Sequence, residues 1–262
     1  MRTEDFTKVL KIIAYFFVIL SIVAFFVMNA YGQESGADWL DKIDKAERVD
    51  FSYGEMAQTI TTSTGKERTL EIKSWTAEGG DLSLMLYTGP ARVKGDKILI
   101  RDGGDNIWYY MKRRDVTRHF TGHTRRQKAM GSDFSYQDLS QGDMTEDYVA
   151  EVLGSEKIKD IDCVKLNCVP TESGPSYAKV VVWASKEDYM SRQIEYYDEK
   201  GLLKTLYISD FREVEGRSTA FLMEMVNHRE NSKTIMRTVS LTYSVEPKSR
   251  MFTKSALSEK FD

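Results

Sequence analysis

The chain of 262 residues has few residues of the types that cross-link small folds or bind metals: two cysteines, four prolines and three histidines. Two cysteines cannot supply a disulfide framework, and a C-x4-C pair alone is too little for a zinc site. We expect Cys163 and Cys168 to be unpaired, because five steps along a strand cover about 16 Å and a disulfide needs Cα atoms within about 7 Å. A disulfide is the alternative if the protein is exported to an oxidising compartment.

The chain also lacks a strong charge of one sign and a recognisable catalytic motif. Its 37 basic and 40 acidic residues nearly balance, so no global basic field points to nucleic acid. There is no phosphate-binding glycine loop, and Ser132 lacks the second glycine of a nucleophile elbow. His119 and His123 would form a metal pair only on a helix, and Gly122 between them indicates a loop or strand. We therefore predict no enzyme activity, no metal and no cofactor.

One long apolar run is present, near the N-terminus. Arg2, Lys8 and Lys11 precede apolar residues 12–28, and small residues at 30 and 32 fit a cleavage site after Gly32. This is the pattern of a secretory signal, residues 1–32. A retained membrane anchor is the alternative, because the run is close to the ~20 residues that span a bilayer. Residues 33–262 are then expected to form one domain.

The rest of the chain reads as one helix followed by strands. Residues 37–49 place Trp39, Leu40 and Ile43 on one helical face, and Asp38 is a candidate N-cap. Turn signals then recur every 8–12 residues, which is typical of an antiparallel meander. Strands are predicted at residues 67–76, 81–87, 97–101, 107–111, 116–120, 162–169, 176–184, 192–197, 202–210, 219–227 and 234–245.

Two segments break this regularity. Residues 125–139 lack the period of two, and we expect a helix or helix pair there, interrupted by Gly131. Residues 146–153 fit either a short helix or the entry into a strand, and we favour the strand. Neither segment contains a linker rich in glycine, serine or proline.

Several motifs resemble those of the outer-membrane lipoprotein-sorting family, the LolA-like periplasmic carriers. They are GDK at residues 95–97, DNIWYY at 105–110, MGSDFSYQDL at 130–139, YAKVVVW at 177–183, EYYD at 195–198 and MFTK at 251–254. The resemblance covers residues 89–257. It implies a mainly β fold with a few helices: a highly curved antiparallel sheet, an unclosed barrel, wrapped around lid or plug helices.

The same resemblance implies a role, a place and partners. The expected protein is a non-enzymatic monomer in the periplasm of a Gram-negative bacterium, where it shields acyl chains of a lipid or lipoprotein between inner and outer membrane. An inner-membrane transporter of the RND or MMPL type would hand over the cargo. A membrane-anchored lipid sensor or adaptor is the alternative. In well-known members a barrel arginine helps to hold the lid, but no motif in this sequence identifies it.

Strand parity gives candidates for the lipid-binding wall, with ordinary core positions as the alternative for each. Met130 and Phe134 belong to the expected lid, where a flexible methionine suits irregular partners. The complete candidate set is Trp75, Leu84, Leu86, Ile98, Ile100, Trp108, Tyr110, Met130, Phe134, Trp183, Tyr196, Met223 and Met225.

Basic residues cluster just after the second strand of the predicted hairpin. Arginine suits phosphate because its planar fork binds two oxygens at once. We therefore consider a contact with lipid headgroups or an acidic partner, with a solvated loop face as the alternative. The candidates are Arg113, Arg114, Arg118, Arg125 and Arg126.

Overall fold

The computed structural model describes residues 34–140 and 142–259. The predicted signal, residues 1–32, lies outside the described residues, so its cleavage stays a prediction. The chain divides into two units, Met1–Ser35 and Gly36–Asp262, and every element below belongs to the second. Within the described residues, no helix is both long and apolar enough to cross a membrane.

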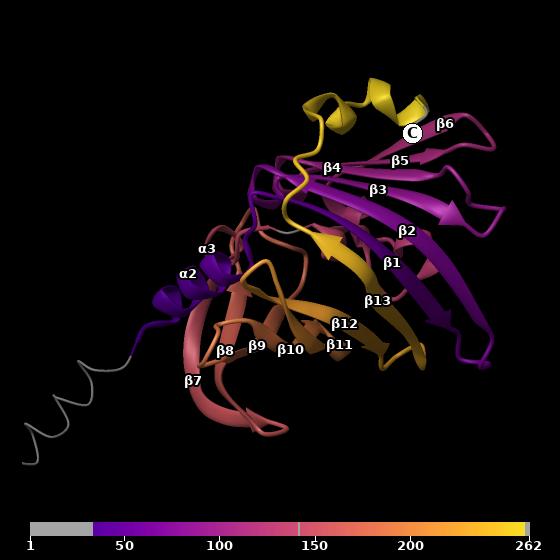
Figure 1. Cartoon of the computed structure of the whole chain (residues 1–262). Coiled ribbons are helices and arrows are strands. Elements are labelled where there is room, and N and C mark those ends of the chain that lie inside the picture. The colour runs from indigo at the N-terminus through magenta and orange to yellow at the C-terminus, as the bar shows by residue number, and fades with distance from the viewer. Residues whose placement is uncertain (1–33, 141, 260–262) are drawn as a thin grey trace, which may run out of the picture. The chain divides into compact units, whose positions relative to one another are not determined.

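The unit contains two α-helices, thirteen strands and several single 3₁₀ turns among its described residues (Figure 1). The helices are α2 (Gly36–Glu47) and α3 (Met144–Asp147). The strands are β1 (Phe51–Thr61), β2 (Glu67–Ala77), β3 (Leu82–Gly89), β4 (Lys97–Arg101), β5 (Asn106–Met111), β6 (Val116–Phe120), β7 (Tyr148–Ile158), β8 (Ile161–Pro170), β9 (Lys179–Ser185), β10 (Ser191–Asp198), β11 (Gly201–Val214), β12 (Arg217–Asn227) and β13 (Ser232–Thr242). The 3₁₀ turns are η1 (Glu78–Gly80), η2 (Asp102–Gly104), η3 (Gly122–Arg126), η4 (Ala129–Gly131), η5 (Tyr136–Leu139), η6 (Ser249–Phe252) and η7 (Ser255–Ser258).

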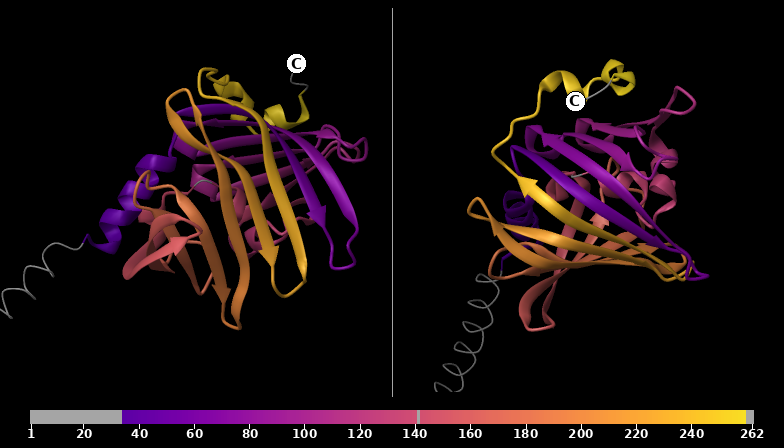
Figure 2. Two further views of the ribbon diagram at one scale, coloured as in Figure 1. Left: turned by 60° about the horizontal axis from the view of Figure 1, so that its bottom comes forward. Right: turned by 45° about the vertical axis from the view of Figure 1, so that its right-hand side comes forward.

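All thirteen strands form one antiparallel sheet in the order β6-β5-β4-β3-β2-β1-β13-β12-β11-β10-β9-β8-β7. The pairing of β1 with β13 joins the two halves of the chain, and the edge strands β6 and β7 are not paired with each other. The sheet curves strongly without closing, as both views in Figure 2 show. The predicted fold class, a curved unclosed antiparallel sheet, is confirmed.

The local pattern of the predicted hairpin is also confirmed. Strands β4 and β5 pair from Lys97–Tyr110 to Arg101–Asn106. The turn between them needs positive φ angles, which Gly103 and Gly104 adopt at 63° and 109°.

The two faces of the sheet bury different partners. Along β3, Met85 and Tyr87 pack into the large core on the concave face, whereas Leu82 and Leu84 point to the opposite side. There Phe252 and Leu257 of the C-terminal segment cover them, as the yellow segment above β3 and β4 in Figure 1 indicates. The ammonium group of Lys97 holds this segment, because it donates to the carbonyl oxygens of Ala256 at 3.2 Å and Leu257 at 2.9 Å.

The expected helix or helix pair at residues 125–139 is wrong. Residues 121–140, which we call the plug segment, contain only the 3₁₀ turns η3, η4 and η5. Met130 and Gly131 break the helical path with φ angles of 53° and 72°. Ser135 and Asp138 instead form a capping box around η5. The segment is folded by polar contacts and by burial of Phe134, Tyr136 and Leu139 against the concave face.

The first helix, the strand after residue 147 and the unpaired cysteines agree with the sequence-based predictions. Helix α2 begins at Gly36 and buries Trp39, Leu40 and Ile43 as predicted, so Asp38 lies in its first turn. Residues 148–158 form β7, which confirms the strand after the short helix α3. Strand β1, residues 51–61, was not predicted. Both cysteines of β8 are buried and free.

Candidate functional site

Two buried carboxylates attach the plug segment to the sheet. Asp133 has a side chain that is 1% exposed, and it accepts hydrogen bonds from Ser232 at 2.6 Å and Thr234 at 2.8 Å, both on β13. The Thr234 hydroxyl also accepts the backbone N–H of Asp133 at 2.9 Å. Lys128 adds an ion pair at 3.2 Å. The carboxylate is therefore well compensated although it is buried.

The second carboxylate, Asp138, forms a buried ion pair with Lys204 of β11. It also accepts the hydroxyl of Tyr177 at 2.5 Å and the backbone N–H of Ser135 at 2.6 Å. Burial raises the pKa of Tyr177, and the nearby negative charge of Asp138 raises it further, so the phenol stays a donor. These contacts assign a structural role to the two acids of the MGSDFSYQDL motif.

An arginine of the sheet also holds the plug segment. The guanidinium of Arg68, on β2, donates a 2.5 Å hydrogen bond to the carbonyl oxygen of Met130. A Cβ atom at Gly131 would come within 2.5 Å of the same guanidinium, which would have to move, and the φ of 72° at this position favours glycine. No motif in the sequence identifies an arginine of this kind, and the contact is visible only in the fold.

A cavity of about 300 Å³ lies between the plug segment and the concave face of the sheet. Methionine is its most frequent apolar residue type, with one methionine each on β1, β3, β12 and β13 and one just before β10. The methionines are Met56, Met85, Met190, Met223 and Met236. Phe134, Leu139, Ile208 and Leu241 add apolar surface, while several serine and threonine hydroxyls make the wall partly polar.

Two acidic residues line this cavity: Asp138, which is paired with Lys204, and Glu47, in the last turn of α2. Glu47 is exposed, and the partial loss of hydration beside the surrounding protein raises the pKa of its carboxyl group, although the backbone N–H of Ser191 donates to it at 2.9 Å. The charge of Asp44 raises the pKa further and that of Arg192 lowers it. The cavity thus contains an acid that is easier to protonate than a fully hydrated glutamate.

The structure divides the predicted wall residues between the two faces. Residues that belong to the concave core are Ile98, Ile100, Met130, Phe134, Tyr196, Met223 and Met225. Of these, Phe134 and Met223 line the methionine-rich cavity, and Met130 lines a second cavity described below. Contact of any of them with lipid stays a prediction.

The remaining predicted wall residues lie on the other face, which corrects their expected position. Trp75, Leu84, Trp108 and Tyr110 pack in the cluster that Phe252 and Leu257 cover. Leu86 shares their side of β3 by strand alternation, and it pairs with Lys97. Trp183 packs with Cys163 and Val181 in a third cluster. Parity therefore combined residues of both faces into one expected wall, and the C-terminal segment covers the part of the outer face around Leu84, Trp108 and Tyr110.

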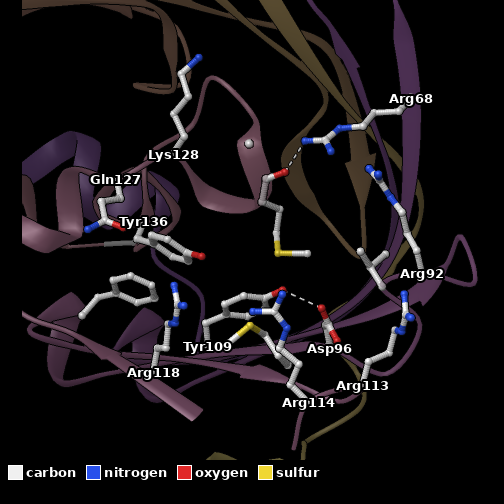
Figure 3. Close-up of a pocket in the computed structure, with 15 residues that line it drawn as sticks. Arg68, Arg92, Asp96, Tyr109, Arg113, Arg114, Arg118, Gln127, Lys128 and Tyr136 are labelled. Atoms are coloured by element: carbon white, nitrogen blue, oxygen red, sulfur yellow. Dashed lines mark hydrogen bonds between the residues drawn. The ribbon is translucent and has the colours of Figure 1, made fainter. Parts of the chain in front are cut away.

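The second cavity, of about 650 Å³, is strongly basic (Figure 3). Arg113, Arg114 and Arg118 of the predicted basic set line it. Arg125 lies elsewhere and donates to the carbonyl oxygen of Gly104 at 2.8 Å and to Asp105 at 3.0 Å. Arg126 is exposed and does not line the cavity.

Sequence reasoning missed most of the methionine cavity and half of the basic one. The missed methionines lie on strands, or next to one, and the inward face of these strands is not the more apolar face in the sequence. They are Met56, Met85, Met190 and Met236. On β3, the alternation of Ser83, Met85 and Tyr87 with the leucines could have indicated that a second, less apolar face lines the cavity. Arg68 and Arg92 are distant in sequence from the basic stretch, so only the fold brings them to it.

The histidines of the sequence can be placed in the part of the chain that the structure describes. There, His, Cys, Asp and Glu form no group of three suited to hold a metal ion. His119 stacks on Trp108 with ring centroids 4.6 Å apart, and its Nε2 lies 3.0 Å from the side-chain oxygen of Asn106.

Comparisons with known proteins agree on the family. A family model described as "Uncharacterized protein"-like matches residues 79–259, more than half of the chain. A DUF1329 family protein from Desulfovibrio piger superposes with a TM-score of 0.80 at 28% identity, over 85% of this chain and 97% of that one. No curated protein matches the chain in sequence.

Two further solved structures have a similar fold. A domain from Vibrio parahaemolyticus, described as an outer membrane lipoprotein-sorting protein, has a TM-score of 0.79 at 27% identity, with 85% and 98% of the two chains covered. A LolA superfamily protein from Nitrosomonas europaea shares the fold, with a TM-score of 0.71 at 19% identity over 86% and 100% of the chains. The chain therefore belongs to the family whose model matches residues 79–259, and its fold is that of the solved structures described as a LolA superfamily protein and as an outer membrane lipoprotein-sorting protein domain.

Proposed function

We propose that the protein is a non-enzymatic carrier that shields the acyl chains of a lipid or lipoprotein in the methionine-rich cavity. The observation that carries this proposal is the cavity itself, since five methionines line the space between the concave sheet and the plug segment. Methionine side chains are flexible and polarizable, so they adapt to an acyl chain of variable shape. Family membership supports the same role.

The energetics fit a carrier that has to open. Burial of one methylene contributes about 0.8 kcal/mol, so an acyl chain gains affinity with each carbon that enters. The cavity volume of about 300 Å³ is at the lower end of ligand sites, which span about 300–1,000 Å³. A whole acyl chain thus requires that the plug segment move away from the sheet. The plug is held by polar contacts, which can exchange, rather than by a continuous helix packed on the sheet.

The proposal extends to location and partners on the strength of the family and the predicted export signal. The carrier would work in the periplasm of a Gram-negative bacterium, as a monomer, and receive its cargo from an inner-membrane transporter of the RND or MMPL type. No catalytic residue is assigned, and no nucleic acid is expected to bind.

Native mass spectrometry of the protein tests the proposal directly. The full-length chain would be expressed in a Gram-negative host, purified without detergent, and measured before and after lipid extraction. A lipid or acylated peptide bound in stoichiometric amount is the expected result. A mass without any adduct, together with no uptake from added liposomes, would contradict the carrier and favour the membrane-anchored sensor or adaptor.

A further inference from the structure

The basic cavity combines cations from four separate parts of the fold. Arg68 lies on β2, Arg92 follows β3, Arg113 and Arg114 lie in the turn after β5, and Arg118 lies on β6. Figure 3 shows Arg68, Arg92 and Arg113 along one side of the cavity, with Arg118 across from them. The alternative interpretation, a solvated loop face formed by one basic stretch of sequence, does not explain this arrangement. Two of the five arginines, Arg68 and Arg92, lie far from that stretch in sequence.

These cations lack compensating carboxylates. Across residues 34–140 and 142–259, none of the five arginines has an acidic side chain within 4.0 Å. Asp96 is the one acid in the wall, and it accepts the hydroxyl of Tyr109 at 2.6 Å and the backbone N–H of Lys112 at 2.9 Å. The sixth cation, Lys128, is already paired with Asp133 and Glu230.

The pKa of Arg68 is lowered by its surroundings. Burial lowers the pKa of its guanidinium, and the neighbouring charge of Arg92 lowers it further. One of its N–H groups is bound to the carbonyl oxygen of Met130. An anion in the cavity would relieve the repulsion between the two arginines, since opposite charges favour the ionised forms.

Apart from Asp96 and Gln127, the remaining wall is mostly apolar or aromatic. Val93, Met111, Phe120 and Met130 supply apolar surface, and Tyr109 and Tyr136 lie between the arginines (Figure 3). Phe120 stacks on Tyr136 with ring centroids 4.1 Å apart. Cationic groups above an apolar wall match an amphiphile that carries a compact anion.

We infer that the basic cavity binds the phosphate group of a phosphate-bearing amphiphile through Arg68, Arg92, Arg113, Arg114 and Arg118. Arginine forks bind two phosphate oxygens in parallel, and several forks around one cavity favour a multiply charged anion. The assignment rests on the proposed carrier function for the source of the phosphate, a lipid headgroup. The phosphate site itself does not depend on that function.

Calorimetric titration of the full-length protein tests the site with three soluble probes: inorganic phosphate, dihexanoyl phosphatidate and dihexanoyl glycerol. The matched variants are Arg118→Gln, which removes one cavity arginine, and Arg126→Gln, which removes an exposed arginine of the same basic stretch. Loss of one charge-assisted contact should weaken phosphatidate binding about tenfold or more in Arg118→Gln. In Arg126→Gln the affinity should stay within about twofold of the unaltered protein, because this exposed charge does not line the cavity and is screened by solvent.

Each outcome of this titration decides a specific point. Tighter binding of phosphatidate than of inorganic phosphate assigns the site to a lipid headgroup, and equal binding assigns it to free phosphate. No binding of either probe, an equal loss in both variants, or equally tight binding of dihexanoyl glycerol would overturn the site. If phosphate binds but no acyl chain is taken up in the mass spectrometry experiment, the phosphate site stands and the carrier function fails.

Discussion

The ammonium group of Lys204 on β11 and the carboxylate of Asp138 in the plug segment form an ion pair with side chains that are 5% and 2% exposed. The Lys204 ammonium also donates to the carbonyl oxygen of Asp133 at 3.3 Å, and it lies 5.2 Å from the ring centroid of Tyr196. Two charges at this depth lose most of their hydration. They are stable there because each compensates the other.

Removal of one partner should therefore destabilise the protein strongly. We expect Lys204→Met to lower the free energy of unfolding by about 3–5 kcal/mol, because Asp138 is left as an uncompensated buried charge. The measurement is urea unfolding followed by circular dichroism. Asp41→Asn is the control, since its ion pair with Lys45 is exposed and should contribute less than about 1 kcal/mol. Similar losses in both variants would contradict the assigned role of the buried pair.

The methionine-rich cavity can be tested with two neighbouring positions of β13. Thr238 lines the cavity, whereas Val239 is on the other face and 65% exposed. We expect Thr238→Lys to reduce the amount of bound lipid about tenfold or more, because an unpaired ammonium group is costly beside an acyl chain.

Val239→Lys should keep normal lipid binding and serves as the matched control. The readout is the lipid-to-protein ratio after incubation with liposomes, alongside the melting temperature of each variant. Equal binding by both folded variants would remove this cavity from the proposed acyl site.

Glu47 should make lipid binding dependent on pH. An acyl chain that enters the cavity displaces water and favours the neutral carboxyl group, so binding is coupled to proton uptake. The affinity should be highest below the pKa of Glu47, which the partial loss of hydration raises, and should fall as the pH rises through it. In Glu47→Gln, affinity measured by fatty-acid displacement between pH 4 and 8 should lose this dependence. A dependence that is unchanged in the variant would assign it to another group.

Asp147 should influence stability through its raised pKa. Burial raises this pKa from 3.8 to about 6, so the folded protein binds more protons than the unfolded chain between these values. Its contribution to stability is therefore present below pH 3.8 and is lost as the pH rises through about 6.

The substitution Asp147→Asn should accordingly stabilise the protein at pH 7.5 by about 1 kcal/mol, since the partly exposed carboxylate is also screened by water. The gain should disappear near pH 3.5. Glu146→Gln, which changes an exposed neighbouring carboxylate, is the control in the same chemical denaturation series. A gain for Asp147→Asn that does not vary with pH would disprove the linkage.

Both cysteines should react with thiol reagents only after unfolding. Cys163 and Cys168 are fully buried and free. Burial raises the pKa of Cys168 to about 12 and also raises that of Cys163, so little of the reactive thiolate forms at neutral pH. Titration with DTNB should detect two thiols in urea and none on the same timescale in buffer. Absence of free thiols in urea would instead reveal a disulfide.

The sequence alone determined most of the strands and their antiparallel meander. The hairpin β4–β5 and the strands from β8 to β13 were predictable because alternation of apolar residues and turn signals are local properties. Strand β1 was not predictable in this way. Gly54 and Gln58 occupy two of its buried positions, so the apolar alternation is weak.

The tertiary structure decided which face of each strand is the site. The leucines of β3 looked like cavity residues, but Phe252 and Leu257 cover them from a segment about 170 residues later in the chain. The plug segment is not helical because Asp133 and Asp138 find partners on β13 and β11, which local sequence does not reveal.

The basic cavity also depends partly on local sequence and partly on the tertiary structure. The run from Arg113 to Arg118 was visible in the sequence, and its charge follows from composition alone. Only the paired order of β2 to β6 and the turn after β3 bring Arg68 and Arg92 beside it. Hydrophobic period and turn chemistry act between near neighbours, whereas burial, ion pairing and cavity walls depend on residues that are close only in the folded chain.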